Sequence, residues 1–162
     1  MIATDIPAEE QGTGMLFNMD GEVVGMISSS VWNDTGKNVV NAYGISDLKP
    51  IIELLINGKS VPYIGIYGTT VTEQLAEEHK MPSGIYVADV DPDSPAMAAG
   101  IQIGDIICEA SGEEIKDIAA YQNIVIGSSV GETMEFVGKR LGSDGYVNIK
   151  FSVVTTEKEE VK

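Results

Sequence analysis

A series of helix and turn signals in residues 84–115 constrains the fold more than any other part of the sequence. A β-prone apolar run at 84–90 is followed by Ser94 and Pro95, and a short alanine-rich stretch then ends at Gly100. Serine before the first turn, proline within it and glycine just past the last turn are the signals of a short, capped helix. The sequence therefore predicts a strand followed by a short helix.

Similar signals divide the rest of the second half of the chain into short elements. Apolar runs rich in β-branched residues predict strands, and apolar residues three or four apart predict helices. The further expected strands are 63–67, 106–110, 133–139 and 146–154, and the further expected helices are 71–79 and 117–126. We therefore expect residues 59–155 to form a small α+β domain, a partly closed barrel with two or three helices. The charged residues 156–162 are expected to be a disordered tail.

Residues 1–58 form a separate segment of the sequence, for which we expect a hairpin, a strand and a helix. Strands are expected at 15–17 and 22–28, because Asp20 and Gly21 between them suit a tight turn. A third strand is expected at 38–44, followed by a helix that ends near Gly58. We expect this part to be separate from the domain that follows.

Charge and apolar patterning exclude some partners. Ten basic against 25 acidic residues give a formal net charge of -15, which would repel a nucleic acid backbone. No apolar run reaches the roughly 18 residues needed to cross a bilayer, so no membrane segment is expected in this chain. The single cysteine cannot form an internal disulfide.

The order of strand, capped helix, Gly-Asp turn at Gly104, second strand and glycine turn at Gly112 resembles the PDZ domain. PDZ domains bind extended peptides, usually free C-termini, by adding them as a strand beside a loop of backbone amides. The resemblance implies that Tyr63, Ile64, Gly65 and Ile66 form this loop, as in the bacterial branch of the family. Glycine is needed because successive N–H groups converge on an anion only in backbone conformations that a side chain would crowd.

The helix from Asp117 would form the opposite wall of the peptide groove. We expect Tyr121, Gln122 and Val125 to line the groove, and Ile118 and Ile124 to belong mostly to the core. The expected partners are peptide or protein C-termini, and unfolded polypeptide is a further possibility.

Residues 1–58 resemble the C-terminal end of the trypsin-like domain of HtrA/Deg serine proteases, which precedes a PDZ domain in that family. The resemblance rests on residues 14–27, on 42–45 and on the helix after them. Aligned on Asp20-Gly21, the position of the catalytic serine falls on Gly12. The family's catalytic histidine and aspartate would precede Met1, and a hydroxyl without a base is inert at neutral pH.

These features lead to one functional expectation and two alternatives. We expect a peptide-binding module in a catalytically incomplete HtrA-like fragment, with no catalytic residue in this chain. The first alternative is the regulatory or substrate-binding part of an active serine endopeptidase whose catalytic residues lie outside this chain. The second is a module for self-association into a homo-oligomer. The family suggests a bacterial parent that is extracytoplasmic or membrane-anchored.

No metal and no cofactor is expected. Asp89, Asp91 and Asp93 start like a calcium-binding loop, but Ser94 and Gly100 stand where such a loop needs glycine and glutamate. Asp93 or Ser94 is expected to cap the helix instead. The only histidine, His79, has no second histidine and no cysteine near it in sequence.

Overall fold

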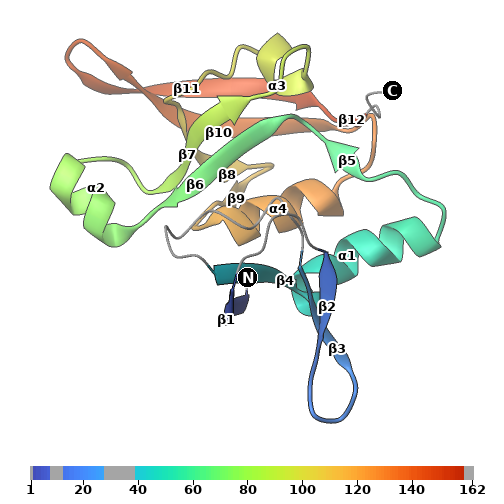
Figure 1. The fold of residues 1–162 in the computed structure, drawn as a ribbon. Helices are drawn as coiled ribbons and strands as arrows, with labels where there is room; N and C mark the ends of the chain where they lie inside the picture. Colours follow the sequence, from blue (N-terminus) through green and yellow to red (C-terminus); the bar gives the residue numbers. More distant parts are fainter. Residues whose placement is uncertain (1, 8–12, 28–38, 159–162) are drawn as a thin grey trace. The chain divides into compact units, whose positions relative to one another are not determined.

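The computed structural model describes residues 2–7, 13–27 and 39–158. The chain divides into two compact units, residues 1–56 and 57–162 (Figure 1). The two units are described separately below.

In its described residues, the first unit is a four-stranded antiparallel sheet in the order β1-β4-β3-β2, followed by one helix. Its turn between β2 and β3 is stabilised by Asn18, whose Oδ1 accepts the N–H groups of Asp20 and Glu22 at 3.0 and 2.9 Å. Gly21 has a φ of +81°, which a side chain would disfavour. The predicted hairpin is therefore confirmed. The elements are β1 (Ile2–Pro7), β2 (Gly14–Phe17), β3 (Val23–Ile27), β4 (Val39–Gly44) and α1 (Ile45–Ile56).

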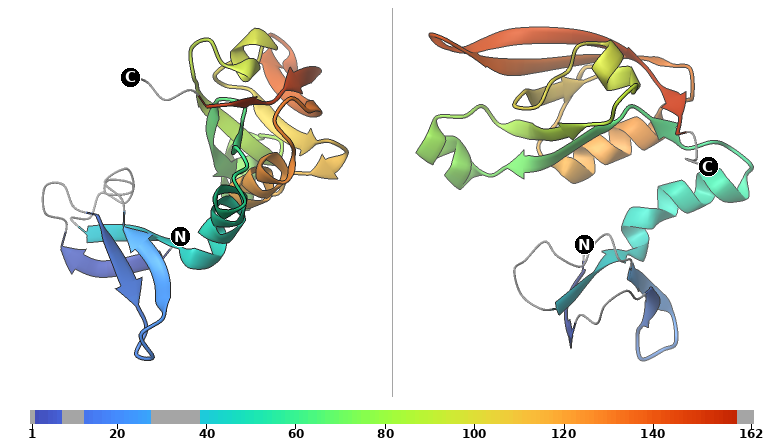
Figure 2. Two further views of the ribbon diagram at one scale, coloured as in Figure 1. Left: turned by 90° about the vertical axis from the view of Figure 1, so that its right-hand side faces the viewer. Right: turned by 45° about the horizontal axis from the view of Figure 1, so that its top comes forward.

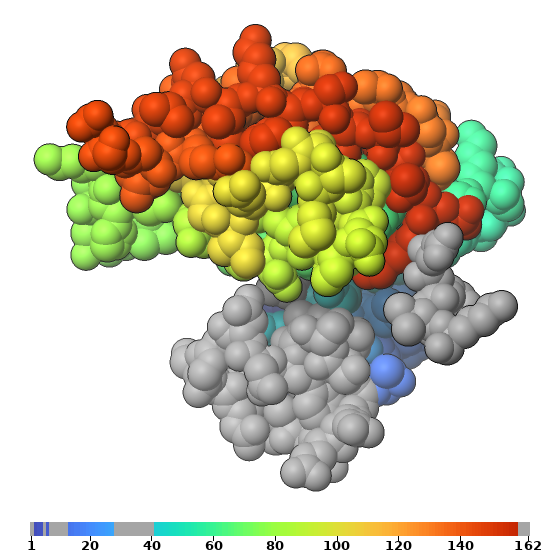
Figure 3. Space-filling model, turned by 90° about the horizontal axis from the view of Figure 1, so that it is seen from above, coloured from blue at the N-terminus to red at the C-terminus, as the bar shows by residue number. Residues whose placement is uncertain are grey.

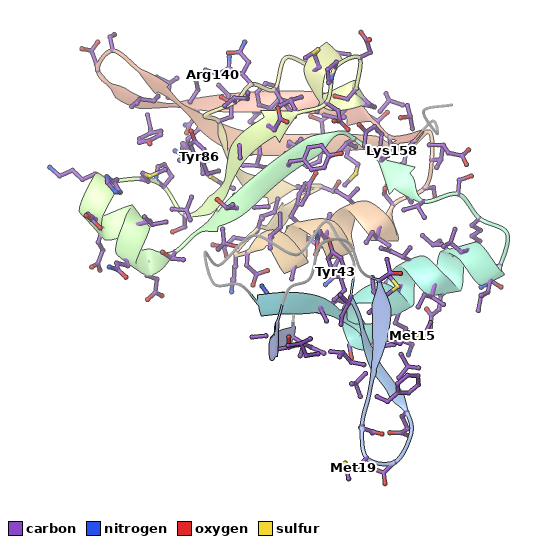
Figure 4. The ribbon with its side chains drawn as sticks, in the orientation of Figure 1. Met15, Met19, Tyr43, Tyr86, Arg140 and Lys158 are labelled. Atoms are coloured by element: carbon purple, nitrogen blue, oxygen red, sulfur yellow. The ribbon has the colours of Figure 1, made fainter. Side chains whose placement is uncertain are left out.

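Large apolar side chains stay exposed on the first unit. Met15 and Phe17 lie on β2, an edge strand, and Met19 lies at the tip of the hairpin (Figure 4). Leu55 and Ile56, at the end of α1, are exposed as well. Such apolar surface favours association, but self-association stays a prediction, which light scattering at several protein concentrations would test.

The second unit is α+β, as the sequence predicts. Its main sheet has the antiparallel order β11-β10-β8-β7-β6, with β9 paired to β8, and within the described residues it is open, with β6 at one end. Its strands are β5 (Pro62–Tyr63), β6 (Ile66–Val71), β7 (Gly84–Val90), β8 (Ile106–Ala110), β9 (Glu113–Glu114), β10 (Thr133–Gly142), β11 (Gly145–Val154) and β12 (Thr156–Glu157). Its helices are α2 (Glu73–His79), α3 (Pro95–Ala98) and α4 (Ile118–Gly127).

Side chains from the sheet, α3 and α4 form one apolar core in this unit. Phe136 and Val87 are fully buried, and α4 contributes Tyr121 and Val125. Figure 2 shows α4 running along the sheet near β6, and Figure 3 shows the face on which α3 lies against β11. The core thus fixes both helices relative to the edge strand β6.

Local capping explains where the helices of this unit begin. Ser94 Oγ accepts the N–H of Met97 at 3.2 Å, so Ser94 is the cap of α3, as expected. Asp117 Oδ1 accepts the N–H of Ala120 at 2.7 Å and caps α4 in the same way. These caps satisfy backbone donors that a helix leaves without partners at its start.

The end of the described chain differs from the expectation. Thr156 and Glu157 form β12, which pairs antiparallel with Tyr63 and Pro62 of β5. The prediction of a disordered tail is therefore wrong for residues 156–158. A short charged segment contains no sequence pattern that indicates backbone pairing with a distant strand.

Candidate functional site

The turn between β5 and β6 holds the four residues singled out from the sequence. Gly65 has a φ of +84°. The carbonyl oxygens of this turn are held from one side: that of Ile64 accepts the N–H of Ala96, and that of Gly65 accepts the N–H of Asp91, both at 2.9 Å. No hydrogen bond from the N–H of Ile64 or Gly65 is made within the described part of the chain. These two amides are thus left for another acceptor.

The outer edge of β6 offers a third amide. Ile66 on β6 lies opposite Val90 on β7. Because the hydrogen bond beside them runs from the Asp91 N–H to the Gly65 carbonyl, Ile66 and Val90 form a non-hydrogen-bonded pair. The N–H and C=O groups of Ile66 therefore point away from β7. Because β6 is the last strand of its sheet, the N–H and C=O of Ile66 face its open edge. Successive N–H groups from Ile64 to Ile66 can hold an anion, and the edge can pair with a further strand.

Helix α4 packs against this edge, but its side chains are divided differently from the expectation. Tyr121 and Val125 are buried in the same core cluster as Ile64 and Ile66, and Gln122 is exposed. Burial raises the pKa of Tyr121.

Ile118 and Ile124, expected in the core, are only partly buried at its margin. The N–H of Ile118 donates to Thr70 Oγ1 at 3.0 Å and ties the start of α4 to β6. Helical spacing identifies an apolar face but not its direction, which packing against β6 decides. The structure thus brings Tyr121 and Val125 together with the turn and leaves Gln122 in solvent.

Beside the turn lies a polar cluster, Tyr63, Tyr67, Asp91 and Lys158, of which the sequence indicated only Tyr63 as a site residue. The hydroxyl of Tyr63 donates to Asp91 Oδ2, and that of Tyr67 donates to the same oxygen at 2.8 Å. The Lys158 ammonium donates to the Tyr67 hydroxyl at 2.9 Å and lies 3.5 Å from Asp91 Oδ2. It also lies 5.1 Å from the centroid of the Tyr63 ring. Figure 4 shows Lys158 beside the β5–β6 turn.

The cluster shifts the acid–base equilibria of its members. Hydrogen bonds from Tyr63 and Tyr67, followed by the charge of Lys158, hold the pKa of Asp91 below its ordinary value of 3.8. Burial and the neighbouring Asp91 carboxylate raise the pKa of Tyr63. The hydrogen bond to Tyr67 raises the pKa of Lys158. Asp91 is therefore a carboxylate at neutral pH and holds Tyr63, Tyr67 and Lys158 beside the turn.

We expect this cluster to lose its stabilising effect in acid. Because the pKa of Asp91 is lower in the folded chain than in the unfolded chain, its contribution is complete above the unfolded pKa and disappears as pH falls through the folded pKa. The difference in thermal midpoint between the native chain and Asp91→Asn should be constant from about pH 7 to about pH 5 and shrink below about pH 4. Thermal unfolding followed by circular dichroism measures it. A difference unchanged down to about pH 2.5 would contradict the assignment.

Gly12, the expected position of the nucleophile, lies outside the described residues. Within residues 2–7, 13–27 and 39–158, no three His, Cys, Asp or Glu side chains are grouped to hold a metal ion. None of the helices in these ranges is long and apolar enough to cross a membrane.

Comparisons with known proteins agree with the resemblance found in the sequence. Residues 86–140 match the family described as "PDZ domain". The chain is 30% identical over 155 residues to a "Probable periplasmic serine endoprotease DegP-like" of Halomonas elongata, covering 91% of this chain and 32% of that protein. It is 30% identical over 160 residues to the "Serine protease Do-like HtrA" of Bacillus subtilis, covering 91% of this chain and 34% of that protein.

A solved structure with a similar fold is the "HtrA-type protease AlgW with decapeptide". Its TM-score is 0.57 at 21% identity, covering 91% of this chain and 46% of that chain. The present chain spans about a third of the length of the two curated relatives.

Proposed function

Since this chain corresponds to the end of the trypsin-like domain and the following PDZ domain of HtrA/Deg serine proteases, we propose that it binds the free C-termini of peptides and proteins by strand addition. The carboxylate accepts hydrogen bonds from the N–H groups of Ile64, Gly65 and Ile66. The peptide backbone pairs with the outer edge of β6. Unfolded polypeptides with accessible ends belong to the same class of ligand.

One observation supports this function above the others: the turn holds its carbonyl oxygens inward and leaves the N–H groups of Ile64 and Gly65 without acceptors in the described part of the chain. Apolar side chains of the turn and of α4 lie in one cluster beside it. We propose that the last peptide side chain packs here, against Ile64, Ile66, Tyr121 and Val125, with Gln122 at the rim. Some outward movement of α4 accompanies binding, because Tyr121 and Val125 are buried in the chain without peptide.

A carboxylate comparison tests the function. A five-residue peptide that ends in valine with a free carboxylate should bind the full chain with a Kd in the micromolar range, about 8 kcal/mol of binding free energy. The same peptide with an amidated C-terminus should bind at least about tenfold more weakly, because it lacks the charged acceptor for the turn amides. Isothermal titration calorimetry measures both. Equal binding of the two peptides would rule out recognition of a free C-terminus.

A second candidate follows from the names of the relatives, which are serine endoproteases. In that case the chain is the substrate-binding part of an active endopeptidase whose catalytic residues lie elsewhere. Gly12 and the absence of a suitable histidine favour catalytic incompleteness of this chain itself. Cleavage of casein by the purified chain, blocked by a serine-protease inhibitor, would overturn that view. Because the relative from Halomonas elongata is named periplasmic, we propose that the parent protein to which this chain belongs is located outside the cytoplasm.

A further inference from the structure

Tyr67 and Asp89 lie side by side on the outer face of the β6–β7 pair. Along β6, Ile66 is buried and Tyr67 is 44% exposed, and on β7 Val90 is buried and Asp89 is exposed. Side chains alternate between the two faces of a strand, and paired residues share a face. Since Tyr67 pairs with Asp89, the two side chains are neighbours in solvent.

A bound peptide would place its penultimate residue at this point. If its carboxylate accepts the N–H of Ile66, the last residue donates its own N–H to the Ile66 carbonyl, and the preceding residue lies opposite Tyr67. The last side chain then shares the buried face of Ile66, and the penultimate side chain shares the outer face of Tyr67. Asp89 is two strands away from the peptide, about 9.6 Å, which a long side chain can bridge.

Of the charged side chains on this face, Lys158 already forms an ion pair and Asp89 forms none with the described residues. The Lys158 ammonium lies 3.5 Å from Asp91 Oδ2, donates to the Tyr67 hydroxyl at 2.9 Å, and lies 5.7 Å from the centroid of the Tyr67 ring. Asp89 accepts only the neighbouring N–H of Val90, at 2.9 Å, and no cation of the described residues lies within ion-pair distance of it. Among the described residues, Asp89 is thus a carboxylate without a cation partner, and it lies next to the exposed ring of Tyr67, which has Lys158 near it.

We propose that Tyr67 and Asp89 select a basic side chain, arginine above all, at the penultimate position of the peptide. A guanidinium is planar, stacks on aromatic rings and pairs with carboxylates, so it matches both groups together. A glutamate there would face the Asp89 carboxylate, while the nearby cation, Lys158, is already paired with Asp91. The net charge of -15 acts in the same direction on any approaching peptide. This selectivity rests on the proposed binding of free C-termini.

The test compares peptides that differ at one residue. Three otherwise identical five-residue peptides with free carboxylates end in Arg-Val, Ala-Val or Glu-Val, and calorimetry with the full chain is done at one ionic strength. The Arg-Val peptide should bind about tenfold more tightly than the Glu-Val peptide, since an exposed ion pair and ring stacking are each modest. Asp89→Asn should reduce this ratio to about threefold.

Asp144→Asn is the matched control, because it removes the same charge from an exposed residue in the turn between β10 and β11. It should leave the ratio unchanged. Equal binding of the Arg-Val and Glu-Val peptides while the Ala-Val peptide binds would overturn the selectivity alone. Equal effects of the two variants would overturn it as well, because the preference would then come from total charge. Failure of all three peptides to bind would remove the proposed function itself.

Discussion

Replacing Gly65 by alanine is expected to lower the free energy of unfolding by about 3 kcal/mol and to abolish peptide binding. Its φ of +84° disfavours any side chain. In addition, an added Cβ would lie 2.3 Å from Ser94 Cβ and 2.9 Å from the Tyr63 hydroxyl oxygen. The turn must move to relieve this overlap, and its amides then no longer point at one acceptor.

The control for this prediction is Gly112→Ala. Gly112 has nearly the same φ, +85°, but nothing lies within 4 Å of the position of an added Cβ. Gly112→Ala should therefore lower the free energy of unfolding by only about 1 kcal/mol, the cost of a side chain at positive φ, and should keep its peptide affinity. Urea denaturation measures stability, and calorimetry measures binding where circular dichroism shows the variants folded. If the two variants lose the same stability, close packing of the turn against Ser94 is wrong; if Gly65→Ala binds normally, the turn is not the site.

Asp105→Asn is expected to lower the free energy of unfolding by about 3 kcal/mol, because it leaves a partly buried guanidinium without its counterion. Asp105 is 1% exposed. Its carboxylate accepts two hydrogen bonds from Arg140, from Nε at 2.6 Å and from a terminal nitrogen at 2.7 Å, and one from the N–H of Gln102 at 2.9 Å. Arg140 also donates to the Gly100 carbonyl at 3.0 Å, so one ion pair joins β10 to the segment after α3.

The Asp105 prediction is checked by urea denaturation, with Asp144→Asn as a variant of equal charge change at an exposed site. The Asp144 variant should stay within about 0.5 kcal/mol of the native chain. A loss for Asp105→Asn no larger than this would mean that the buried pair gives no net stabilisation.

The local signals in the sequence predicted several elements correctly. Ser94 and Pro95 begin α3 and Asp117 caps α4, because capping depends on hydrogen bonds to residues only two or three positions ahead. Predicting one strand through 63–67 was less successful, since the turn at Ile64 and Gly65 separates β5 from β6. An apolar segment with one glycine does not reveal such a break.

Residues close together along the chain were enough to predict the α+β class, the capped helices and the hairpin turn at Asp20-Gly21. Three features depend on tertiary structure and could not be predicted from the sequence. They are the buried face of α4, the ion pair between Arg140 and Asp105, and the contact between Lys158 and Tyr67. The last pair is separated by 91 positions. Their contact arises because β12 pairs with β5, and such pairing depends on the assembled sheet and its edges, which a short sequence pattern does not encode.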